Sequence, residues 1–402
     1  MSKSTGNPGS SSPIDFDDTA IAFQYKSDRD LLLSYLIFIL TKHPFLVKFL
    51  SQAAKLSLSM GLPVKPLIKA TVFRQFCGGE TRREYRKVIE QLGRANIGAI
   101  LDYSVEGGGD EAGFEETKQA ILGIIRQAGS EKNIPFACMK MTGIAAESLL
   151  ERMGAKDDLS KEDEAARERL KKRLSDICRE AGESGTPIYI DAEESWLQDA
   201  IDDLAEEMMS IFNRSGAVVF TTLQMYRTDR LAYFKYLMEK ARNNGFRLGI
   251  KIVRGAYMEQ ERERAERRGY PSPVYPDKEA TDRAFDDVLR LFMEHVHEVE
   301  ICVGTHNETS CRLLAGLMAD RGIPNDHPHV YFSQLYGMSD HISYNLARAG
   351  YNVTKYLPFG PVASTLPYLA RRAEENKAIA GQMGKELEII IRERQRRKSA
   401  SL

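Results

Sequence analysis

Beyond residue 95, short apolar runs rich in β-branched and aromatic residues alternate with longer stretches of mixed polarity. Each longer stretch can hold a helix, and 282–295 and 308–321 have the apolar spacing of amphipathic helices. Short, nearly continuous apolar runs predict strands that are buried on both faces of a parallel sheet. There are eight such runs: Ile97–Tyr103, Pro135–Met141, Pro187–Asp191, Ala217–Leu223, Leu248–Val253, Glu300–Gly304, Val330–Ser333 and Val353–Leu357.

This alternation predicts an α/β fold, a (β/α)8 TIM-type barrel over residues 96–390, rather than an open doubly wound sheet. No glycine-rich G-x-G-x-x-G follows the first run, so a Rossmann-type cofactor site is not indicated. Residues 15–95 are predicted to form an N-terminal helical arm or cap, with helices over 28–60 and 80–92. The highly charged stretch Lys156–Glu183 is interpreted as an extension of the helix that follows the second strand.

The two ends of the chain differ in composition from the predicted barrel. Residues 1–14 are of low complexity and are predicted to be disordered. Residues 391–402 form a basic tail, interpreted as a frayed, solvated helix end rather than a lipid-binding patch. The apolar run Leu31–Leu40 is too short to span a bilayer and is predicted to be a buried helix. Gly107–Gly109 is predicted to be a flexible loop.

Composition narrows the function classes. The chain has 402 residues, of which 43% are hydrophobic, and a formal net charge of −1, which argues against nucleic acid as the main partner. Its five cysteines are scattered and form no Cys-x-x-Cys pair, so neither a disulfide framework nor a zinc site is indicated. A reducing, intracellular compartment fits this cysteine usage. The sequence shows neither a secretory signal nor an arginine-rich transit peptide.

Candidate chemistry lies where the predicted strands end, because active sites of βα barrels are built from the carboxyl ends of the strands. Strand ends are often polar because they lie near water, but here polar residues follow all eight apolar runs. The residues are Asp102, Tyr103 and Glu106; Lys140; Asp191, Glu193 and Glu194; Gln224 and Tyr226; Lys251, Arg254 and Tyr257; Thr305, His306 and Asn307; Gln334; and Tyr356.

A further candidate is the segment Tyr368–Asn376, which has the pattern of a helix that begins after the last strand. On a helix, Glu375 is the i+4 neighbour of Arg371 and the i+3 neighbour of Arg372. Two arginines held by one carboxylate form a fork that suits a small carboxylate ligand. The alternative reading is an ion pair on the surface of an amphipathic helix.

Other kinds of site fit less well. His306 has no second histidine or cysteine nearby in the sequence, which disfavours a metal site. Ser339, Asp340 and His341 are contiguous, which is not the arrangement of a catalytic triad. A lysine inside a barrel could form a Schiff base, as in aldolases. The cations Lys140, Lys251, Arg254, Arg371 and Arg372 exceed what one imine needs, and they suit a ligand with phosphates and a separate carboxylate.

Together these residues resemble the proline dehydrogenase family, whose members are flavin-dependent (β/α)8 barrels. The resemblance extends over about residues 97–380, in the same order, and the helical arm is typical of monofunctional members. Four segments carry it: Asp-Ala-Glu-Glu at 191–194, Lys-Ile-Val-Arg-Gly-Ala-Tyr at 251–257, Thr-His-Asn at 305–307, and Tyr-Leu-Ala-Arg-Arg-x-x-Glu-Asn at 368–376.

The resemblance implies non-covalently bound FAD and oxidation of L-proline to Δ1-pyrroline-5-carboxylate, by hydride transfer from C5 to flavin N5. Electrons would pass to a quinone, with at most peripheral membrane association, and a eukaryotic member would be mitochondrial. The implied catalytic residues are Asp191, Glu193 and Lys251. The implied substrate residues are Lys140, Tyr356, Tyr368, Arg371 and Arg372, with Glu106 as the gate partner of Arg371. The implied cofactor residues are Gln224, Lys251, Arg254, Gly255, Ala256, Tyr257, Thr305, His306, Asn307 and Glu375, of which Glu375 also orients Arg372.

Two positions bear on how far the resemblance carries. Lys251 stands where bacterial bifunctional members have an arginine that donates to flavin N5, so a compact ammonium replaces a planar fork. Tyr356 stands where hydroxyproline-specific members have a small residue. A 4-hydroxyproline dehydrogenase of the same fold, a Schiff-base lyase and a catalytically silent regulatory barrel remain alternatives. Neither the DNA-binding module nor the aldehyde dehydrogenase half of the bifunctional relatives is expected.

Overall fold

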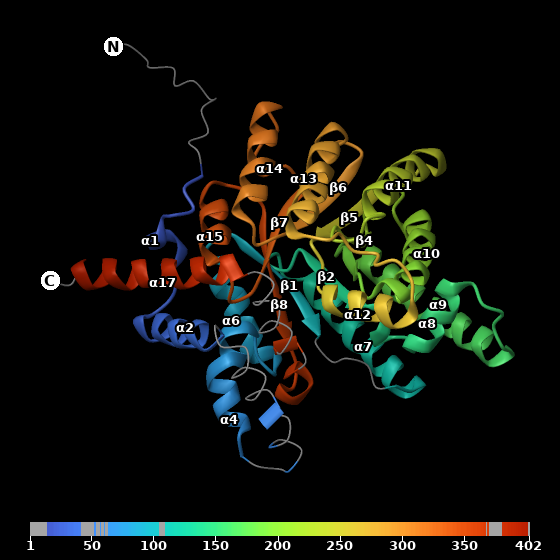
Figure 1. Ribbon diagram of the computed structural model, residues 1–402, viewed down its shortest axis with the longest axis horizontal. Coiled ribbons are helices and arrows are strands. Elements are labelled where there is room, and N and C mark those ends of the chain that lie inside the picture. The colour runs from blue at the N-terminus through green and yellow to red at the C-terminus, as the bar shows by residue number, and fades with distance from the viewer. Residues whose placement is uncertain are drawn as a thin grey trace.

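The computed structural model describes residues 14–41, 52, 53, 57, 60, 63–103, 109–366, 368, 369 and 380–400. Eight parallel strands close into a barrel in sequence order, β1-β2-β3-β4-β5-β6-β7-β8, with helices around it (Figure 1). The predicted (β/α)8 barrel is therefore confirmed. The strands are β1 Ile97–Tyr103, β2 Phe136–Lys140, β3 Ile188–Asp191, β4 Val219–Gln224, β5 Leu248–Val253, β6 Val299–Gly304, β7 Val330–Leu335 and β8 Val353–Phe359.

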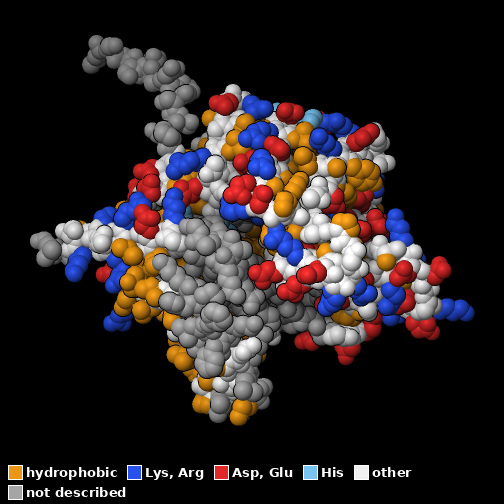
Figure 2. All heavy atoms as spheres, viewed as in Figure 1, with side chains coloured by type: hydrophobic (Ala, Val, Ile, Leu, Met, Phe, Trp, Pro, Cys, Tyr) orange, Lys and Arg blue, Asp and Glu red, His pale blue; other side chains and the backbone are white. Residues whose placement is uncertain are grey.

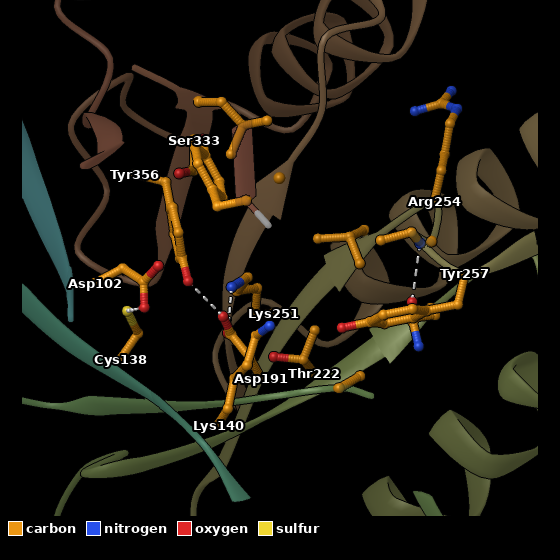
Figure 3. Close-up of a pocket in the computed structure, with 18 of the residues that line it drawn as sticks. Asp102, Cys138, Lys140, Asp191, Thr222, Lys251, Arg254, Tyr257, Ser333 and Tyr356 are labelled. Carbon is orange, nitrogen blue, oxygen red and sulfur yellow. Dashed lines mark hydrogen bonds and ion pairs between the residues drawn. The ribbon is translucent and has the colours of Figure 1, made fainter. Parts of the chain in front are cut away.

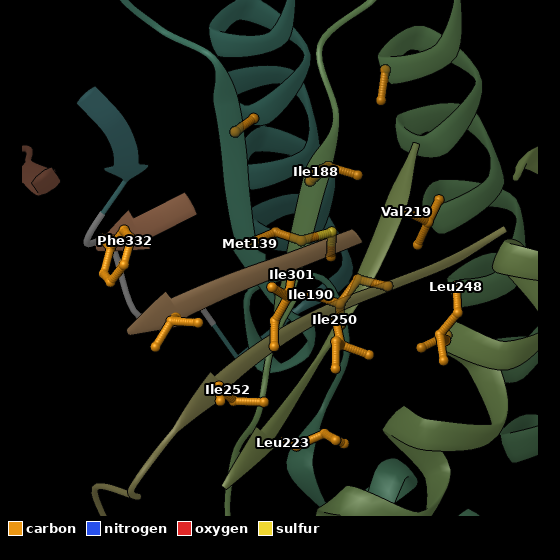
Figure 4. Packing of buried hydrophobic residues seen from close by; sticks show 14 of the residues in the cluster. Met139, Ile188, Ile190, Val219, Leu223, Leu248, Ile250, Ile252, Ile301 and Phe332 are labelled. Atoms are coloured by element: carbon orange, nitrogen blue, oxygen red, sulfur yellow. The ribbon is translucent and has the colours of Figure 1, made fainter. Parts of the chain in front are cut away.

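Helices connect successive strands and cover the outside of the barrel. They are α7 Glu111–Ala128, α8 Glu147–Ala155, α9 Lys161–Ser184, α10 Ser195–Phe212, α11 Arg230–Asn244, α12 Met258–Arg268, α13 Lys278–Glu294, α14 Glu308–Asp320 and α15 Asp340–Arg348. A short 3-10 turn, η2 Met141–Gly143, follows β2 directly. Outward-facing strand residues such as Met139, Ile190 and Ile250 pack against these helices in one continuous apolar core (Figure 4).

The barrel interior is closed at its amino-terminal end by aromatic rings. Phe136 stacks on Tyr189 with ring centroids 4.6 Å apart, and its edge meets Phe220 and Tyr331 at 5.7 and 4.8 Å. Because side chains alternate along a strand, the residues two positions further on face the same interior nearer the carboxyl end. The aromatic floor therefore leaves a site only at the carboxyl-terminal mouth of the barrel.

The charged stretch between β2 and β3 was predicted to extend a single helix, but it is divided between two helices. Lys156 caps α8 in a left-handed conformation with φ 58°, and α9 begins five residues later. Ser160 caps α9 in a capping box with Asp163, which satisfies two backbone donors that would otherwise lack partners. This local chemistry divides the stretch into two helices.

The N-terminal arm is helical where it is described and contacts the barrel at the β7 and β8 ends. Its helices are α1 Thr19–Ala22, α2 Asp28–Thr41, α4 Lys65–Ile68, α5 Arg74–Phe76 and α6 Arg82–Gly93, with the π-helical turn η1 Lys69–Phe73 between α4 and α5. Gln75 donates to the carbonyl of Gly337 at 2.7 Å, and Gly78 donates to the carbonyl of Pro358 at 2.8 Å. A Cβ at Gly337 would lie 1.9 Å from the Gln75 carbonyl oxygen, so this contact requires glycine.

Helix α2 is only half buried, which corrects the prediction for the run Leu31–Leu40. Leu31, Ile37 and Phe38 lie in an apolar cluster that the arm shares with α17 and with residues after β7 and β8, whereas Leu32, Leu36 and Leu40 are 43%, 49% and 42% exposed. Figure 2 shows apolar side chains gathered over α2 and α4 at the lower left. Within the described part of the chain, no helix combines the length and apolar character needed to cross a bilayer.

The basic end is a continuous helix, α17 Ala380–Ala400, rather than a frayed terminus. It packs against α1 and α2 of the arm (Figure 1). Arg397 pairs with Asp28 at 2.8 Å and donates to the carbonyls of Phe23 and Lys26. Arg392 contacts Asp17 at 3.1 Å. Arg392 and Arg397 are thus held by partners from the arm.

A buried ion pair ties β8 to α15 behind the barrel wall. Lys355 is fully buried, and its ammonium lies 2.9 Å from Asp340 Oδ1 and donates to the carbonyl of Met338 at 2.5 Å. The second carboxylate oxygen of Asp340 lies 2.9 Å from Lys26 of the arm. One carboxylate therefore joins the last strand, the helix before it and the N-terminal arm.

Candidate active site

A cavity of about 270 Å³ lies at the carboxyl-terminal mouth of the barrel. Residues from all eight strand ends line it, as expected for the active site of a βα barrel. The lining residues named at the strand ends or by the resemblance are Asp102, Tyr103, Lys140, Asp191, Gln224, Lys251, Arg254, Gly255, Ala256, Tyr257, Thr305, His306, Asn307, Gln334, Tyr356 and Tyr368.

Asp191 is the centre of the buried part of the site. It lies at the end of β3 and is 8% exposed. Its Oδ1 receives Lys251 Nζ from β5 at 2.5 Å, and its Oδ2 receives the Tyr356 hydroxyl from β8 at 2.9 Å. Figure 3 shows both side chains pointing toward this carboxylate. The ammonium also lies 5.0 Å from the centroid of the Tyr356 ring, within cation–π distance.

Burial and charge act in opposite directions on Lys251. Burial alone would lower the pKa of this ammonium, but the nearby Asp191 carboxylate more than offsets that effect and raises it. Lys251 is therefore a fixed cation at neutral pH. For Tyr356, burial and the neighbouring carboxylates Asp102 and Asp191 raise the pKa well above its ordinary value, so its hydroxyl is a hydrogen-bond donor.

The guanidinium of Arg254 is fixed on the other side of the cavity. Its three nitrogens donate to Asp282 at 2.6 Å, Thr305 at 2.6 Å and Ser310 at 3.0 Å, and its plane lies 4.3 Å from the Phe285 ring. Figure 3 shows it pointing away from Asp191. Its contact with Thr305 joins the β5 and β6 ends into one wall.

The turn after β5 brings backbone close to the cavity. Gly255 has φ 137°, and a Cβ there would lie 2.4 Å from the Tyr226 ring. The next amide, Ala256 N–H, donates to Gln224 Oε1 at 3.1 Å, and the amide group of the same glutamine donates to the Glu193 carbonyl at 2.7 Å. Gln224 therefore links the β3, β4 and β5 ends.

The predicted site residues divide into three groups. Most lie together around the cavity, as given above. Glu106, Arg371, Arg372 and Glu375 lie outside the described residues. Glu193 is described but does not line the cavity: its carboxylate accepts from the Thr142 amide at 3.0 Å and from the Thr142 hydroxyl at 2.5 Å. Burial raises the pKa of Glu193, and its contacts hold the turn η2, whereas its catalytic role stays a prediction.

Several lining residues were missed from the sequence. Cys138, Thr222 and Ser333 each lie two positions before the last residue of a strand and face inward, and Lys278 begins α13. The signal was available for the first two, because Cys138 and Lys140, and likewise Thr222 and Gln224, are two residues apart and share a face. Lys278 carried no such signal, since it lies far from β5 in sequence.

Comparison with known proteins identifies the family of the chain. The sequence profile of the family described as "Proline dehydrogenase" matches residues 85–385. The chain belongs to the proline dehydrogenase family. It is 31% identical to "Proline dehydrogenase 1, mitochondrial" of Dictyostelium discoideum, over 94% of this chain and 74% of that protein. It is 30% identical to "Hydroxyproline dehydrogenase" of Xenopus laevis, over 96% of this chain and 90% of that protein.

The fold agrees with solved structures of larger proteins. Proline utilization A from Bdellovibrio bacteriovorus, inactivated by N-propargylglycine, superimposes with a TM-score of 0.69 at 20% identity. That match covers 90% of this chain and 36% of the other, so the chain spans about a third of its length. Proline utilization A of Bradyrhizobium japonicum matches with a TM-score of 0.64, over 77% of this chain. These matches show that the fold of this chain occurs as one part of those larger proteins.

Proposed function

We propose that this chain oxidises L-proline to Δ1-pyrroline-5-carboxylate with bound FAD. The observation that carries the proposal is the buried Asp191–Lys251–Tyr356 cluster at the mouth of a barrel of the proline dehydrogenase family. A carboxylate held between a fixed cation and a tyrosine hydroxyl gives a rigid polar surface, against which a small ring can be placed.

The cavity fits a flavin by three features. Lys140, Lys251 and Arg254 place cations around it, and Lys278 adds another at its edge. The Thr222 hydroxyl is buried against it without a protein hydrogen-bond partner, so a ligand atom can satisfy it. Gly255 and Ala256 bring a stretch of backbone to the cavity wall, where a large planar group could lie against it. When bound, the flavin supplies the acceptor for the hydride from proline C5.

The protein's own residues position the substrate. We assign Arg371 and Arg372 to the substrate carboxylate, because paired arginines bind carboxylates with defined geometry, and Lys140 to the same end of the substrate. Tyr356 and Tyr368 contribute apolar ring faces beside the pyrrolidine. Asp191, beside Lys251, balances the positive charge that develops at the ring nitrogen. Transfer of electrons to a quinone is the remaining part of the proposal.

The spectrum of the purified protein tests the proposal. We expect an absorbance band near 450 nm, as for flavins in general, with about one flavin per chain, that denaturation releases as intact FAD. Anaerobic addition of L-proline should bleach the band, and addition of D-proline should not. Colourless protein that takes up no added FAD, or a borohydride-reducible adduct at Lys140, would contradict the flavin proposal and favour the Schiff-base alternative.

A second candidate function is oxidation of 4-hydroxyproline, favoured by the match to a hydroxyproline dehydrogenase over nearly the whole chain. Two observations favour proline as the substrate: the Tyr356 ring is buried in the cavity wall, and its hydroxyl already donates a hydrogen bond to Asp191. A ring hydroxyl beside it would have to displace the tyrosine or lose its own hydrogen bond.

We therefore expect kcat/KM for L-proline to exceed that for trans-4-hydroxy-L-proline by at least about tenfold, which corresponds to about 1.4 kcal/mol. Tyr356→Ser opens space and should reduce this ratio, mainly by lowering activity on proline. Steady-state kinetics with both substrates on the two proteins measure it. Equal kcat/KM values for the unaltered enzyme would instead establish the hydroxyproline assignment.

A further inference from the structure

Ser339 lies behind the cavity wall and contacts two distant parts of the chain. It is fully buried, in the turn before α15, and has the left-handed φ of 49°, which is uncommon for serine. Its backbone N–H and its hydroxyl both donate to Glu386 Oε1 of α17, at 2.5 and 3.0 Å. Its Oγ also lies 2.9 Å from Nδ1 of His306, a cavity residue on the β6 end.

These contacts determine where the ring proton of His306 lies. A serine hydroxyl has one proton, and here that proton is donated to the Glu386 carboxylate. The Ser339 oxygen must therefore accept the hydrogen bond from His306, which places a proton on Nδ1. In the neutral ring, Nε2 is then the acceptor nitrogen. Glu386, which lies outside the cavity lining, sets the tautomer of a residue inside it.

Helix α17 makes a second contact near His306, because Lys385, which precedes Glu386, pairs with Glu308, two residues after His306. Lys385 pairs with Glu308 at 2.5 Å, and Glu308 accepts from His341 Nε2 at 2.9 Å. Burial alone would raise the pKa of Glu308, but His341 and Lys385 lower it to about 2, so the carboxylate is ionised at neutral pH. Ser339, Asp340 and His341, contiguous in sequence, thus contact three different partners: Glu386, Lys355 and Glu308.

We propose that Ser339 and Glu386 are positioning residues, which hold His306 in its Nδ1–H form so that Nε2 accepts a hydrogen bond from a hydroxyl or N–H group of the bound flavin dinucleotide. The inference rests on the proposed function for the identity of that ligand. The inference goes beyond the proposed function by assigning a positioning role to α17, which supplies no residue to the described cavity lining. The left-handed Ser339 is the conformation that places one hydroxyl between both partners.

The tautomer itself is the decisive measurement. In the purified full-length protein with ¹⁵N-labelled histidine, only seven histidines contribute signals, and loss of one signal in His306→Asn assigns it. Long-range ¹H–¹⁵N correlation should show His306 protonated on Nδ1. Ser339→Ala and Glu386→Ala should shift it toward the Nε2–H form that predominates in water. Glu386→Gln retains an acceptor oxygen and should preserve the Nδ1–H signal. An Nε2–H ring in the unaltered protein would overturn the inference.

Cofactor retention provides the second measurement, with Leu387→Ala as the matched control. Leu387 lies next to Glu386 on α17 and is buried in the apolar cluster that α17 shares with the arm. Its truncation therefore loosens the helix without touching the relay, the chain of hydrogen bonds from Glu386 through Ser339 to His306. Fluorescence of FAD released on dilution of the holoenzyme gives Kd. Ser339→Ala and Glu386→Ala should raise Kd about two- to tenfold, as for loss of one hydrogen bond, and more than Leu387→Ala does. Equal effects in all three variants would reduce the relay to a packing contact.

The two proposals can fail separately. The histidine tautomer is measured without proline turnover, so it supports or overturns the role of Ser339 and Glu386 even in a protein that oxidises no proline. An Nδ1–H ring with no FAD binding would overturn the cofactor proposal and the ligand assigned to Nε2. FAD binding with an Nε2–H ring would overturn only the relay.

Discussion

Replacing Lys355 with methionine should lower the free energy of unfolding by about 3–5 kcal/mol, the usual cost of removing one partner from a buried ion pair. Lys355 is fully buried, and Asp340 is only 6% exposed, so the carboxylate left behind cannot recover its hydration. Lys26, which pairs with the other oxygen of Asp340, offsets only part of this loss, because its side chain is 21% exposed and water screens its charge. Urea denaturation of the two proteins at pH 7 measures the difference.

Two controls separate charge from packing. Lys355→Met combined with Asp340→Asn removes the stranded charge and should be more stable than Lys355→Met alone. Lys26→Met breaks the more exposed half of the network and should cost only about 1 kcal/mol, as for partly solvated pairs. A double variant no more stable than Lys355→Met would show that packing, rather than charge, dominates here.

The effect should also depend on pH. Burial would raise the pKa of Asp340, but Lys26 and Lys355 together hold it well below its usual range. A carboxyl group with a depressed folded-state pKa stabilises the fold above its unfolded pKa of about 4, and this contribution is lost as the pH falls through the folded-state pKa. The stability difference between wild type and Lys355→Met should therefore shrink as the pH is lowered below about 4.

Asp191→Asn should reduce kcat/KM for proline by about ten- to 150-fold, the range for losing a charge-assisted hydrogen bond worth about 1.5–3 kcal/mol. The variant keeps the shape of the side chain but removes the charge that opposes the burial of Lys251. Without that charge, burial should lower the pKa of the ammonium. Activity should then fall as the pH rises through the new pKa, on an alkaline limb absent from the wild type.

Tyr356→Phe is the matched control, because it removes the other hydrogen bond to the same carboxylate and leaves the charge in place. It should lower kcat/KM by less and introduce no new alkaline limb. Profiles of kcat/KM against pH for the three proteins compare these outcomes directly. Parallel profiles for wild type and Asp191→Asn would mean that Asp191 does not control the charge of Lys251.

The barrel was predictable because its strands are local features of the sequence. Each predicted run overlaps its strand, with ends that differ by no more than two residues, since apolar runs buried on both faces differ sharply from the helices between them. The break between α8 and α9 was not predicted, because the left-handed cap is Lys156 rather than a glycine. The order of α17 was missed because ion pairs such as Arg392–Asp17 and Arg397–Asp28 join it to an arm that is distant in sequence.

The site was predictable where chemistry sits at the very end of a strand, and less so elsewhere. Asp191, Lys251 and Tyr356 come from three strands, and the closed barrel necessarily brings those strand ends together. Glu193 follows the same strand as Asp191, but its carboxylate turns back to Thr142, a contact that its place after the strand does not indicate. Contacts such as Ser339 to Glu386 depend on how a late helix docks, which no local pattern encodes.

The docking of α17 on the arm also bears on the order of folding. Arg392 and Asp17 are 375 positions apart, and Arg397 reaches Phe23 over nearly the same separation. During synthesis, α1 and α2 are made first, yet their partner helix is made after the whole barrel. The apolar residues of the arm that α17 covers must therefore wait, exposed or transiently bound elsewhere, until almost the entire chain has emerged. Closure of this contact is thus a late event in folding.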